Sequence, residues 1–297
     1  MKYRDSFDRC HPAVNFLYFA LVLGFTMFLM HPVSLAVSIV SAAVYAVQLN
    51  GAGAVKRSMK CLLPMALLAA VVNPAFNHAG VTIIMYLPGG NPLTLESILY
   101  GLAASGMLLA ALLWFSCVTA VLTTDKFVYL FGRIAPALGL VLSMTVRFVP
   151  RFAARFREAR AARRCLAPAG QEGLIARLRE LAAVLSAMVS WSMENAMDTA
   201  DSMKSRGWGL PGRTAYTVYR LTDRDRGLLL WLGLAGVFLL SCAASGAMDW
   251  RYYPTVRGSL TGVLPVSGQI VYLALCLTPV ILNGWEAVQW KRLRSGI

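Results

Sequence analysis

The sequence predicts an all-α polytopic membrane protein with about six transmembrane helices and two long cytoplasmic helices. Of its 297 residues, 58% are hydrophobic and 14% are charged, which is too apolar for a soluble protein of this length. The 28 lysines and arginines, against 14 acids, lie mostly beside or between long uncharged runs. Basic loops beside apolar segments follow the positive-inside pattern of membrane proteins.

The uncharged runs define the predicted spans. Residues 10–55 carry no charge, and 46 residues of helix at about 1.5 Å each would cross the hydrocarbon core roughly twice. Pro32 divides this run, because proline disfavours helical backbone in the residue before it. A third span is expected to begin at Cys61, with Pro64 in its first turn, where a missing N–H costs little. The six spans are residues 13–30, 33–49, 61–76, 97–123, 227–248 and 268–285.

The charged loops predict the orientation. Lys56, Arg57 and Lys60 indicate a cytoplasmic loop before the third span, which also places the N-terminus inside. Lys291 and Arg292 place the C-terminus inside as well. The chain is therefore expected to be a multi-pass protein of a prokaryotic plasma membrane, with both termini cytoplasmic and no cleaved signal peptide.

Two stretches are expected to face the outside. Residues 73–96 contain Asn-Pro and Pro-Gly-Gly-Asn-Pro, which predict a loop with a short hairpin or a re-entrant turn. Thr94 is the predicted cap of the fourth span, with Glu96 or Ser97 in its first turn. Residues 249–254 form the second outside loop, whose aromatic residues suit the membrane interface.

The central segment differs in kind from the rest. Of the 28 basic residues, 17 lie between Lys126 and Arg226. Residues 134–146 are uncharged for only 13 residues and are interrupted by Pro136, which predicts a helix at the interface rather than a span. The chain is thus expected to divide into a membrane part (1–124), a cytoplasmic and interfacial coupling-helix region (125–226) and a second membrane part (227–297).

Two long helices are expected within that region. Arginines every four residues from Arg147 make one face of the first helix cationic, and residues 167–170, Ala-Pro-Ala-Gly, stop it. The second runs over residues 171–206, 36 residues without proline, about 54 Å of helix. Its apolar stripe alternates steps of four and three, as in a helix packed along another helix. The stripe is Leu174, Leu178, Leu181, Leu185 and Met188.

Arg163 and Arg206 lie near the ends of these two helices. A cation at a helix C-terminus is stabilised by the exposed carbonyls, by about 0.3–1 kcal/mol. Alternatively, a guanidinium at an exposed tip can enter a carboxylate-lined groove of a second protein. Gly207 and Gly209 would let a partner's backbone approach closely.

Other chemistry has little support in the sequence. The six cysteines are scattered singly, the three histidines are not spaced as metal ligands, and a phosphate-binding Gly-x-x-x-x-Gly-Lys-Ser/Thr loop is absent. We therefore expect no catalytic residue, no metal site and no cofactor bound by this chain.

Several motifs resemble one transporter family. Ser-Met-Thr-Val-Arg-Phe-Val-Pro-Arg-Phe at 143–152, Ala-Arg-Ala-Ala-Arg-Arg at 159–164 and Ser-Met-Lys-Ser-Arg-Gly-Trp-Gly at 202–209, with Gly-Arg-Thr at 212–214, resemble the transmembrane T component of energy-coupling factor (ECF) vitamin and metal-ion transporters. The loop at 73–96 is similar to one branch of that family. The likeness covers nearly the whole chain, and it is the order and spacing of the motifs together that make it specific.

The resemblance implies the partners. In this family two arginine motifs at the ends of coupling helices dock into two ABC ATPases, the A and A′ components, which bind the ATP. The membrane part and coupling helices hold a small substrate-binding S component. Here the motifs fall on Ala162, Arg163 and Arg164, and on Ser205, Arg206 and Gly207. Arg164 replaces a glycine and Ser205 an alanine.

The implied function is that of a scaffold for uptake of a vitamin or other micronutrient. Closure of the ATPase pair would move the helix tips, and the long helices would carry that movement to the S component. Two alternatives remain. A membrane-embedded enzyme would need ionisable residues inside the spans, and the predicted spans have none. A membrane-tethered nucleic-acid binder could use the cationic face near Arg147, but no recognised nucleic-acid motif accompanies it.

Overall fold

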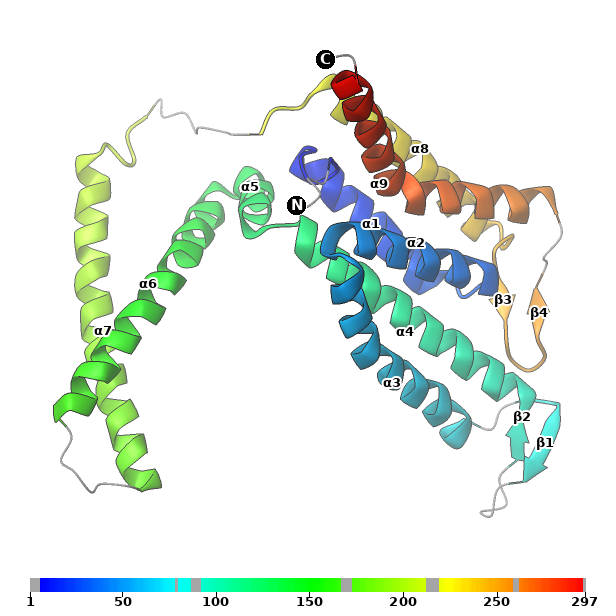
Figure 1. The fold of residues 1–297 in the computed structure, drawn as a ribbon, viewed down its shortest axis with the longest axis horizontal. Coiled ribbons are helices and arrows are strands. Elements are labelled where there is room, and N and C mark those ends of the chain that lie inside the picture. Colours follow the sequence, from blue (N-terminus) through cyan, green and yellow to red (C-terminus); the bar gives the residue numbers. More distant parts are fainter. Residues whose placement is uncertain are drawn as a thin grey trace. The chain divides into compact units, whose positions relative to one another are not determined.

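The chain folds into helices that form two compact units (Figure 1). The computed structural model describes residues 6–77, 80–86, 92–166, 173–211, 219–258 and 262–295. These residues form nine α-helices and four short β-strands. The membrane unit is Met1–Lys126 with Tyr219–Ile297, and the arm unit is Phe127–Val218. The two outer parts of the chain therefore belong to one unit.

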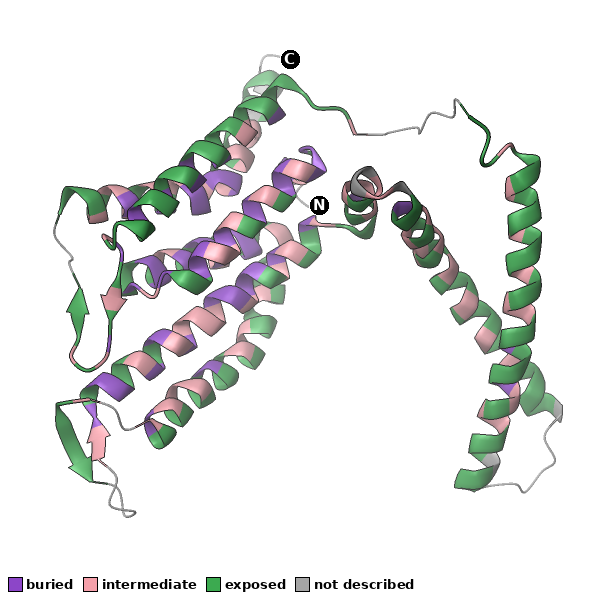
Figure 2. Cartoon of the chain, turned by 180° about the vertical axis from the view of Figure 1, so that it is seen from behind, coloured by how far each residue is buried: buried purple, intermediate pink, exposed green. Residues whose placement is uncertain are grey.

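Six helices build the membrane unit. α4 packs against α2 and α3, α9 packs against α2 and α8, and α1 packs against α4 and α8. Most of the chain's buried residues lie in these helices (Figure 2). The helices are α1 (Pro12–Phe28), α2 (Pro32–Asn50), α3 (Ala52–Phe76), α4 (Leu95–Val121), α8 (Asp223–Ala244) and α9 (Val263–Ser295).

Buried polar groups inside this bundle satisfy one another. The Thr26 hydroxyl lies 2.9 Å from both the Ser38 hydroxyl and the Tyr272 hydroxyl, and Trp114 Nε1 donates to Ser38 Oγ at 2.9 Å. All four side chains are buried. Uncharged groups with mutual hydrogen bonds can be buried at little cost, whereas unpaired ones cannot. The mutual hydrogen bonds therefore explain why these polar side chains can be buried between the helices.

Local sequence explains where the helices begin. Pro32 occupies the first turn of α2, and His31 Nδ1 accepts from the Val33 N–H at 3.2 Å, so the predicted break before Pro32 is confirmed. The predicted cap at Thr94 is also confirmed, because its hydroxyl accepts from the Ser97 N–H at 3.3 Å.

The six helices alternate between two ends of the membrane unit (Figure 1). At the terminal end, the Ser6 N–H donates to Asn283 Oδ1 at 2.9 Å, and Arg224 pairs with Glu286 at 2.8 Å. The beginning and the end of the chain therefore lie at the same end of the unit. At the hairpin end, His31 lies against Trp250 with ring centroids 5.0 Å apart.

Two small antiparallel hairpins mark the hairpin end. β1 (Ile83–Tyr86) pairs with β2 (Pro92–Thr94), which confirms a hairpin in the predicted 73–96 loop. β3 (Trp250–Arg251) pairs with β4 (Arg257–Gly258). This second hairpin was not predicted, since the aromatic residues of 249–254 indicated only an interfacial loop.

The third predicted span was too short at its beginning. Lys56, Arg57 and Lys60 were expected in a loop, but α3 begins at Ala52 and includes all three. Gly51, at φ 80°, makes the turn from α2 in one residue. Pro64 consequently lies inside the helix and not in its first turn. Membrane helices tolerate such prolines, and long basic side chains near a helix end can extend to the interface.

The predicted helix over residues 134–146 has different bounds in the structure. α6 (Pro136–Leu166) is one continuous helix of 31 residues with Pro150 inside it. Pro136 begins α6 instead of interrupting a helix. By length and apolar composition, the helices able to cross a membrane among the described residues are α2, α3, α4, α6, α8 and α9. α1, with 17 residues, is shorter than these.

The arm unit contains most of α5 (Thr124–Ile134), all of α6 and α7 (Leu174–Ser205). α5 was not predicted; its Phe127 and Phe131 stack one turn apart, with centroids at 5.1 Å. The second long helix begins at Leu174 instead of residue 171. The predicted stop at 167–170 lies outside the described residues, although α6 does end at Leu166.

Candidate docking arm

α6 and α7 pack side by side and run antiparallel. Phe152 meets Trp191 edge to face, with centroids 5.4 Å apart and an interplanar angle of 85°. Further along α6, Arg160 lies opposite Glu180, which precedes Trp191 in α7. At successive contacts the residue numbers increase along α6 and decrease along α7. The C-terminal ends of the two helices therefore point in opposite directions.

The face of α7 that meets α6 differs from the predicted stripe. Val184 and Met188 are buried, at 2% and 9% exposure, and Leu181 and Trp191 are half-buried. Leu181 and Met188 therefore belong to the packed face as predicted. Leu174, Leu178 and Leu185 do not, because they are 78%, 57% and 56% exposed.

The exposed leucines form a second apolar face on α7. At about 100° per residue, the members of this outer face fall within roughly one quadrant of the helix surface. An apolar face left open along a helix usually marks a protein or membrane contact. The outer face is Leu174, Leu178, Leu185, Val189 and Met193, each at least 56% exposed.

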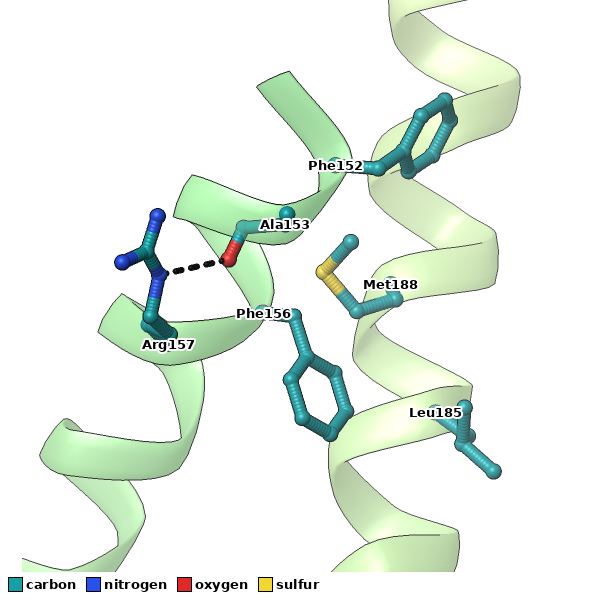
Figure 3. Close-up of a pocket in the computed structure, with 6 residues that line it drawn as sticks. All are labelled: Phe152, Ala153, Phe156, Arg157, Leu185 and Met188. Carbon is teal, nitrogen blue, oxygen red and sulfur yellow. Dashed lines mark hydrogen bonds between the residues drawn. The ribbon is translucent and has the colours of Figure 1, made fainter. Parts of the chain in front are cut away.

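A groove opens where the two helices cross. It encloses about 590 Å³ and is mostly apolar. In Figure 3, Phe152 and Phe156 extend from α6 on the side of α7, and Met188 of α7 lies between them. Arg157 points away from α7, and its Nε donates to the Ala153 carbonyl at 3.1 Å. Arg157 lines the groove but directs its guanidinium away from α7, and the groove surface is mostly apolar.

The first arginine motif lies inside the last turns of α6. Arg163 is exposed and makes no ion pair with any described residue. Arg164 differs, because its Nε lies 3.8 Å from Glu180 Oε1 on α7. Arg160 Nε lies at the same distance from that oxygen. Arg164 therefore links the two helices, whereas Arg163 is available to another molecule.

The second motif forms the end of α7. Arg206 is the C-cap and is exposed. Gly207, at φ 77°, donates its N–H to the Lys204 carbonyl at 2.9 Å, and the Trp208 N–H donates to the Met203 carbonyl at 3.0 Å. This pair of hydrogen bonds is a Schellman motif, which requires a left-handed residue after the cap. Gly207 is thus needed by the helix end itself.

The departures from the family pattern now have structural explanations. α6 continues to Leu166, so its third motif position is helical and does not need glycine. Arginine has a high helix propensity and fits there. The hydroxyl of Ser205 donates to the Ser202 carbonyl at 2.9 Å, within the helix. Serine can therefore stand in the alanine position without an unpaired hydroxyl.

The two exposed arginines lie far apart. Arg164 is level with Glu180, and Arg206 lies 26 residues beyond Glu180 along α7. At about 1.5 Å per residue the separation along the helix is roughly 39 Å. The arm therefore offers two separate cationic sites, one at each end.

The sequence did not identify several residues that shape this arm. Glu180 was not singled out, although it is the acid that Arg160 and Arg164 meet. The aromatic residues Phe148, Phe152 and Phe156 repeat every four positions, a signal of the face that packs on α7. Among the described residues, no three His, Cys, Asp or Glu side chains are grouped as metal ligands.

Comparison with known proteins agrees with this architecture. The family model described as cobalt transport protein, CbiQ, matches residues 5–216, which include the arm and both arginine motifs. The chain belongs to the CbiQ family. The family resemblance predicted from the motifs is confirmed.

A curated relative supports the same family assignment. The chain is 34% identical over 106 residues to a protein of Lactobacillus helveticus (strain DPC 4571) named "Energy-coupling factor transporter transmembrane protein EcfT". That match covers 35% of this chain and 38% of the relative. The described helices and the family together support a multi-pass membrane protein with a role in transport.

Proposed function

We propose that this protein is the transmembrane scaffold of an ECF-type importer, in which two ATPases dock at the ends of the arm. The observation that carries the proposal is the placement of Arg163 and Arg206. Both are exposed, and they lie at opposite ends of an antiparallel helix pair. A separation of roughly 39 Å suits two ATPase subunits better than one. The name of the L. helveticus relative supports the same role.

The chemistry of each tip suits a carboxylate-lined groove. A guanidinium offers a planar fork of donors that matches a carboxylate, and such charge-assisted hydrogen bonds are the strong ones. Arg206 also lies at a helix end where the Schellman motif satisfies the Met203 and Lys204 carbonyls. A partner can therefore approach the tip without competing for those carbonyls.

The apolar surfaces of the arm suit a membrane partner. The outer face of α7 and the groove beside Phe156 and Met188 leave apolar side chains without a partner inside the arm. We assign these surfaces to the small S component that selects the substrate. The outer-face leucines of the predicted stripe, Leu174, Leu178 and Leu185, then contact that subunit instead of α6. The description of the family names cobalt, which lies within the predicted class of micronutrients.

Docking is tested by co-purification. The Arg163→Ala/Arg206→Ala double variant should lose both ATPases and ATP-dependent uptake, while the wild type recovers them. Removing one member of a buried charge pair at an interface costs about 2–5 kcal/mol, enough to abolish recovery. Arg151→Ala/Arg179→Ala is the matched control, since it removes two other exposed arginines, one from each arm helix.

The outcomes separate clearly. If the double variant still recovers both ATPases and supports uptake, the docking proposal is wrong. If the control variant loses them equally, general positive charge on the arm explains binding and the two tips have no special role.

A further inference from the structure

The chain leaves α7 through a defined turn over residues 206–210. The Gly207 N–H donates to the Lys204 carbonyl at 2.9 Å, and the Leu210 N–H donates to the Gly207 carbonyl at 3.3 Å. Gly207 and Gly209 have φ values of 77° and 93°, in the left-handed region that favours glycine. Hydrogen bonds and two glycines therefore fix the backbone of the 206–210 turn.

Two large apolar side chains of this turn are exposed beside Arg206. Trp208 is 42% exposed and Leu210 is 66% exposed. A Cβ added to Gly207 would lie 3.1 Å from Leu210 Cδ1, so the Leu210 side chain folds back over the residue that follows Arg206. An apolar side chain at the position of Trp208 commonly contacts the last turn of its helix, yet a large part of this indole still meets solvent.

This combination is typical of a protein-binding hot spot. The few residues that dominate a protein interface are enriched in tryptophan and arginine. An anchor that is already fixed in its bound conformation loses little entropy on binding. Because Leu210 lies over Gly207, a partner that binds the Arg206 guanidinium also lies next to Leu210.

The charges along the end of α7 favour a protein partner over the membrane surface. Glu194, Asp198 and Asp201 are exposed. Asp201 lies 4.0 Å from Lys204, whereas Glu194 and Asp198 make no ion pair with any described residue. Residues 194–206 thus hold three acids against two basic residues, Lys204 and Arg206, a net charge of −1. Helices that lie on a membrane carry mostly lysine and arginine on their polar face.

The first tip has a different composition. Arg163 lies within α6 and not in a turn beyond it. Residues 157–164 consist of four arginines, one glutamate and three alanines, a net charge of +3. This stretch of α6 therefore presents charge, whereas the 206–210 turn presents apolar surface beside one guanidinium.

We propose that Trp208 and Leu210 are the apolar anchor of the second tip, and that they enter an apolar pocket of the ATPase that binds Arg206. The pocket lies beside the carboxylates that receive the guanidinium. The ATPase at this tip is bound largely through apolar contact, and the ATPase at Arg163 is bound largely through charge. This inference rests on the proposed function and adds the chemistry of the partner surface at each tip.

A variant with one intact tip isolates the anchor. Arg163→Ala leaves only the second tip, and in that background Trp208→Ala or Leu210→Ser should weaken binding of the purified ATPases about tenfold, equal to about 1.4 kcal/mol. Trp208→Phe should retain binding, because it keeps an aromatic side chain. Trp285→Ala is the matched control, since it removes a tryptophan of α9 that is 65% exposed.

Salt distinguishes the chemistry of the two tips. Raising the ionic strength from about 0.1 M to about 1 M shortens the Debye length from about 10 Å to about 3 Å. Binding to Arg163→Ala, through the second tip, should change less than about threefold, whereas binding to Arg206→Ala, through the first tip, should fall about tenfold or more. Equal falls for the two variants would overturn the proposal.

Two other results would also contradict the anchor. If weaker binding by Trp208→Ala comes with faster hydrogen exchange of the Gly207 amide, the indole only stabilises the helix end. If ATPase binding is unchanged, and brominated phosphatidylcholine in nanodiscs quenches the fluorescence of the wild type more than that of Trp208→Phe, lipid covers the turn instead.

Failure of the anchor can be told from failure of docking. If Arg163→Ala/Arg206→Ala still binds both ATPases, the docking proposal itself is wrong. If that double variant loses them while Trp208→Ala in the Arg163→Ala background keeps full binding, only the anchor is wrong.

Discussion

Replacing Lys126 with methionine tests how the membrane unit is held together where the chain leaves it. The side chain of Lys126 is 5% exposed, and its Nζ lies 2.7 Å from Asp8 Oδ1 and 3.1 Å from the Val121 carbonyl. Nζ also donates to the Asp8 carbonyl. Lys126 is the last residue of the membrane unit before the arm unit begins.

The expected cost differs between the two partners. Lys126→Met leaves the Val121 and Asp8 carbonyls without their donor, and an unpaired buried polar group costs about 1–3 kcal/mol. Asp8→Asn retains an oxygen acceptor, and the Asp8 side chain is 45% exposed to water. Lys126 keeps its oxygen acceptors and water screens the half-exposed partner, so the loss of charge should cost about 1 kcal/mol or less.

The assay is reversible unfolding in mixed micelles with increasing dodecyl sulfate, followed by tryptophan fluorescence. Lys60→Met is the control, because it removes an exposed lysine from α3. The reasoning fails if Asp8→Asn destabilises as much as Lys126→Met, since the carboxylate would then dominate. It also fails if Lys126→Met behaves like Lys60→Met.

Three further predictions concern the arm. Gly207→Ala forces a left-handed alanine and should cost about 1–2 kcal/mol at the end of α7, seen as faster hydrogen exchange of the Trp208 amide. Glu180→Gln should lower arm stability by about 0.2–1 kcal/mol, because its partners Arg160 and Arg164 are partly exposed, and should leave ATPase recovery unchanged. Trp191→Ala should cost about 2 kcal/mol in thermal unfolding, less than the 3–5 kcal/mol of a fully buried tryptophan.

Controls make these outcomes decisive. Gly173→Ala changes a glycine at the other end of α7 with φ −165°, and should not slow or speed exchange at Trp208. Loss of ATPase recovery in Glu180→Gln would show that the Arg164 link positions the first tip. If Trp191→Ala leaves the melting temperature unchanged, the contact with Phe152 does not stabilise the arm.

Charge-free runs were sufficient to predict most of the membrane unit. Residues 97–123 and 227–248 correspond closely to α4 and α8, because a long apolar run flanked by polar residues leaves few alternatives. α3 was mispredicted because three basic residues indicated a loop. A short glycine turn and the ability of long basic side chains to extend to water permit a helix instead.

The arm was predictable in its helices but not in its packing. A proline-free amphipathic stretch predicted α7 to within a few residues. Helical periodicity shows which residues share a face, but not where a partner helix covers it. Leu174 lies beyond the level where α6 meets α7, and Leu185 is turned onto the outer face. The meeting of Arg164 with Glu180 depends on that crossing and could not be read from either helix alone.

The antiparallel crossing leaves unequal lengths of helix between the crossing point and the two exposed arginines. α6 and α7 cross where Phe156 and Met188 line one groove. From there Arg163 lies seven residues away and Arg206 eighteen, or roughly 10 Å and 27 Å along their helices. If the helices pivot rigidly about this point, equal rotations move the Arg206 tip more than twice as far as the Arg163 tip. Under the proposed docking, a single motion would then displace the two ATPases by different distances.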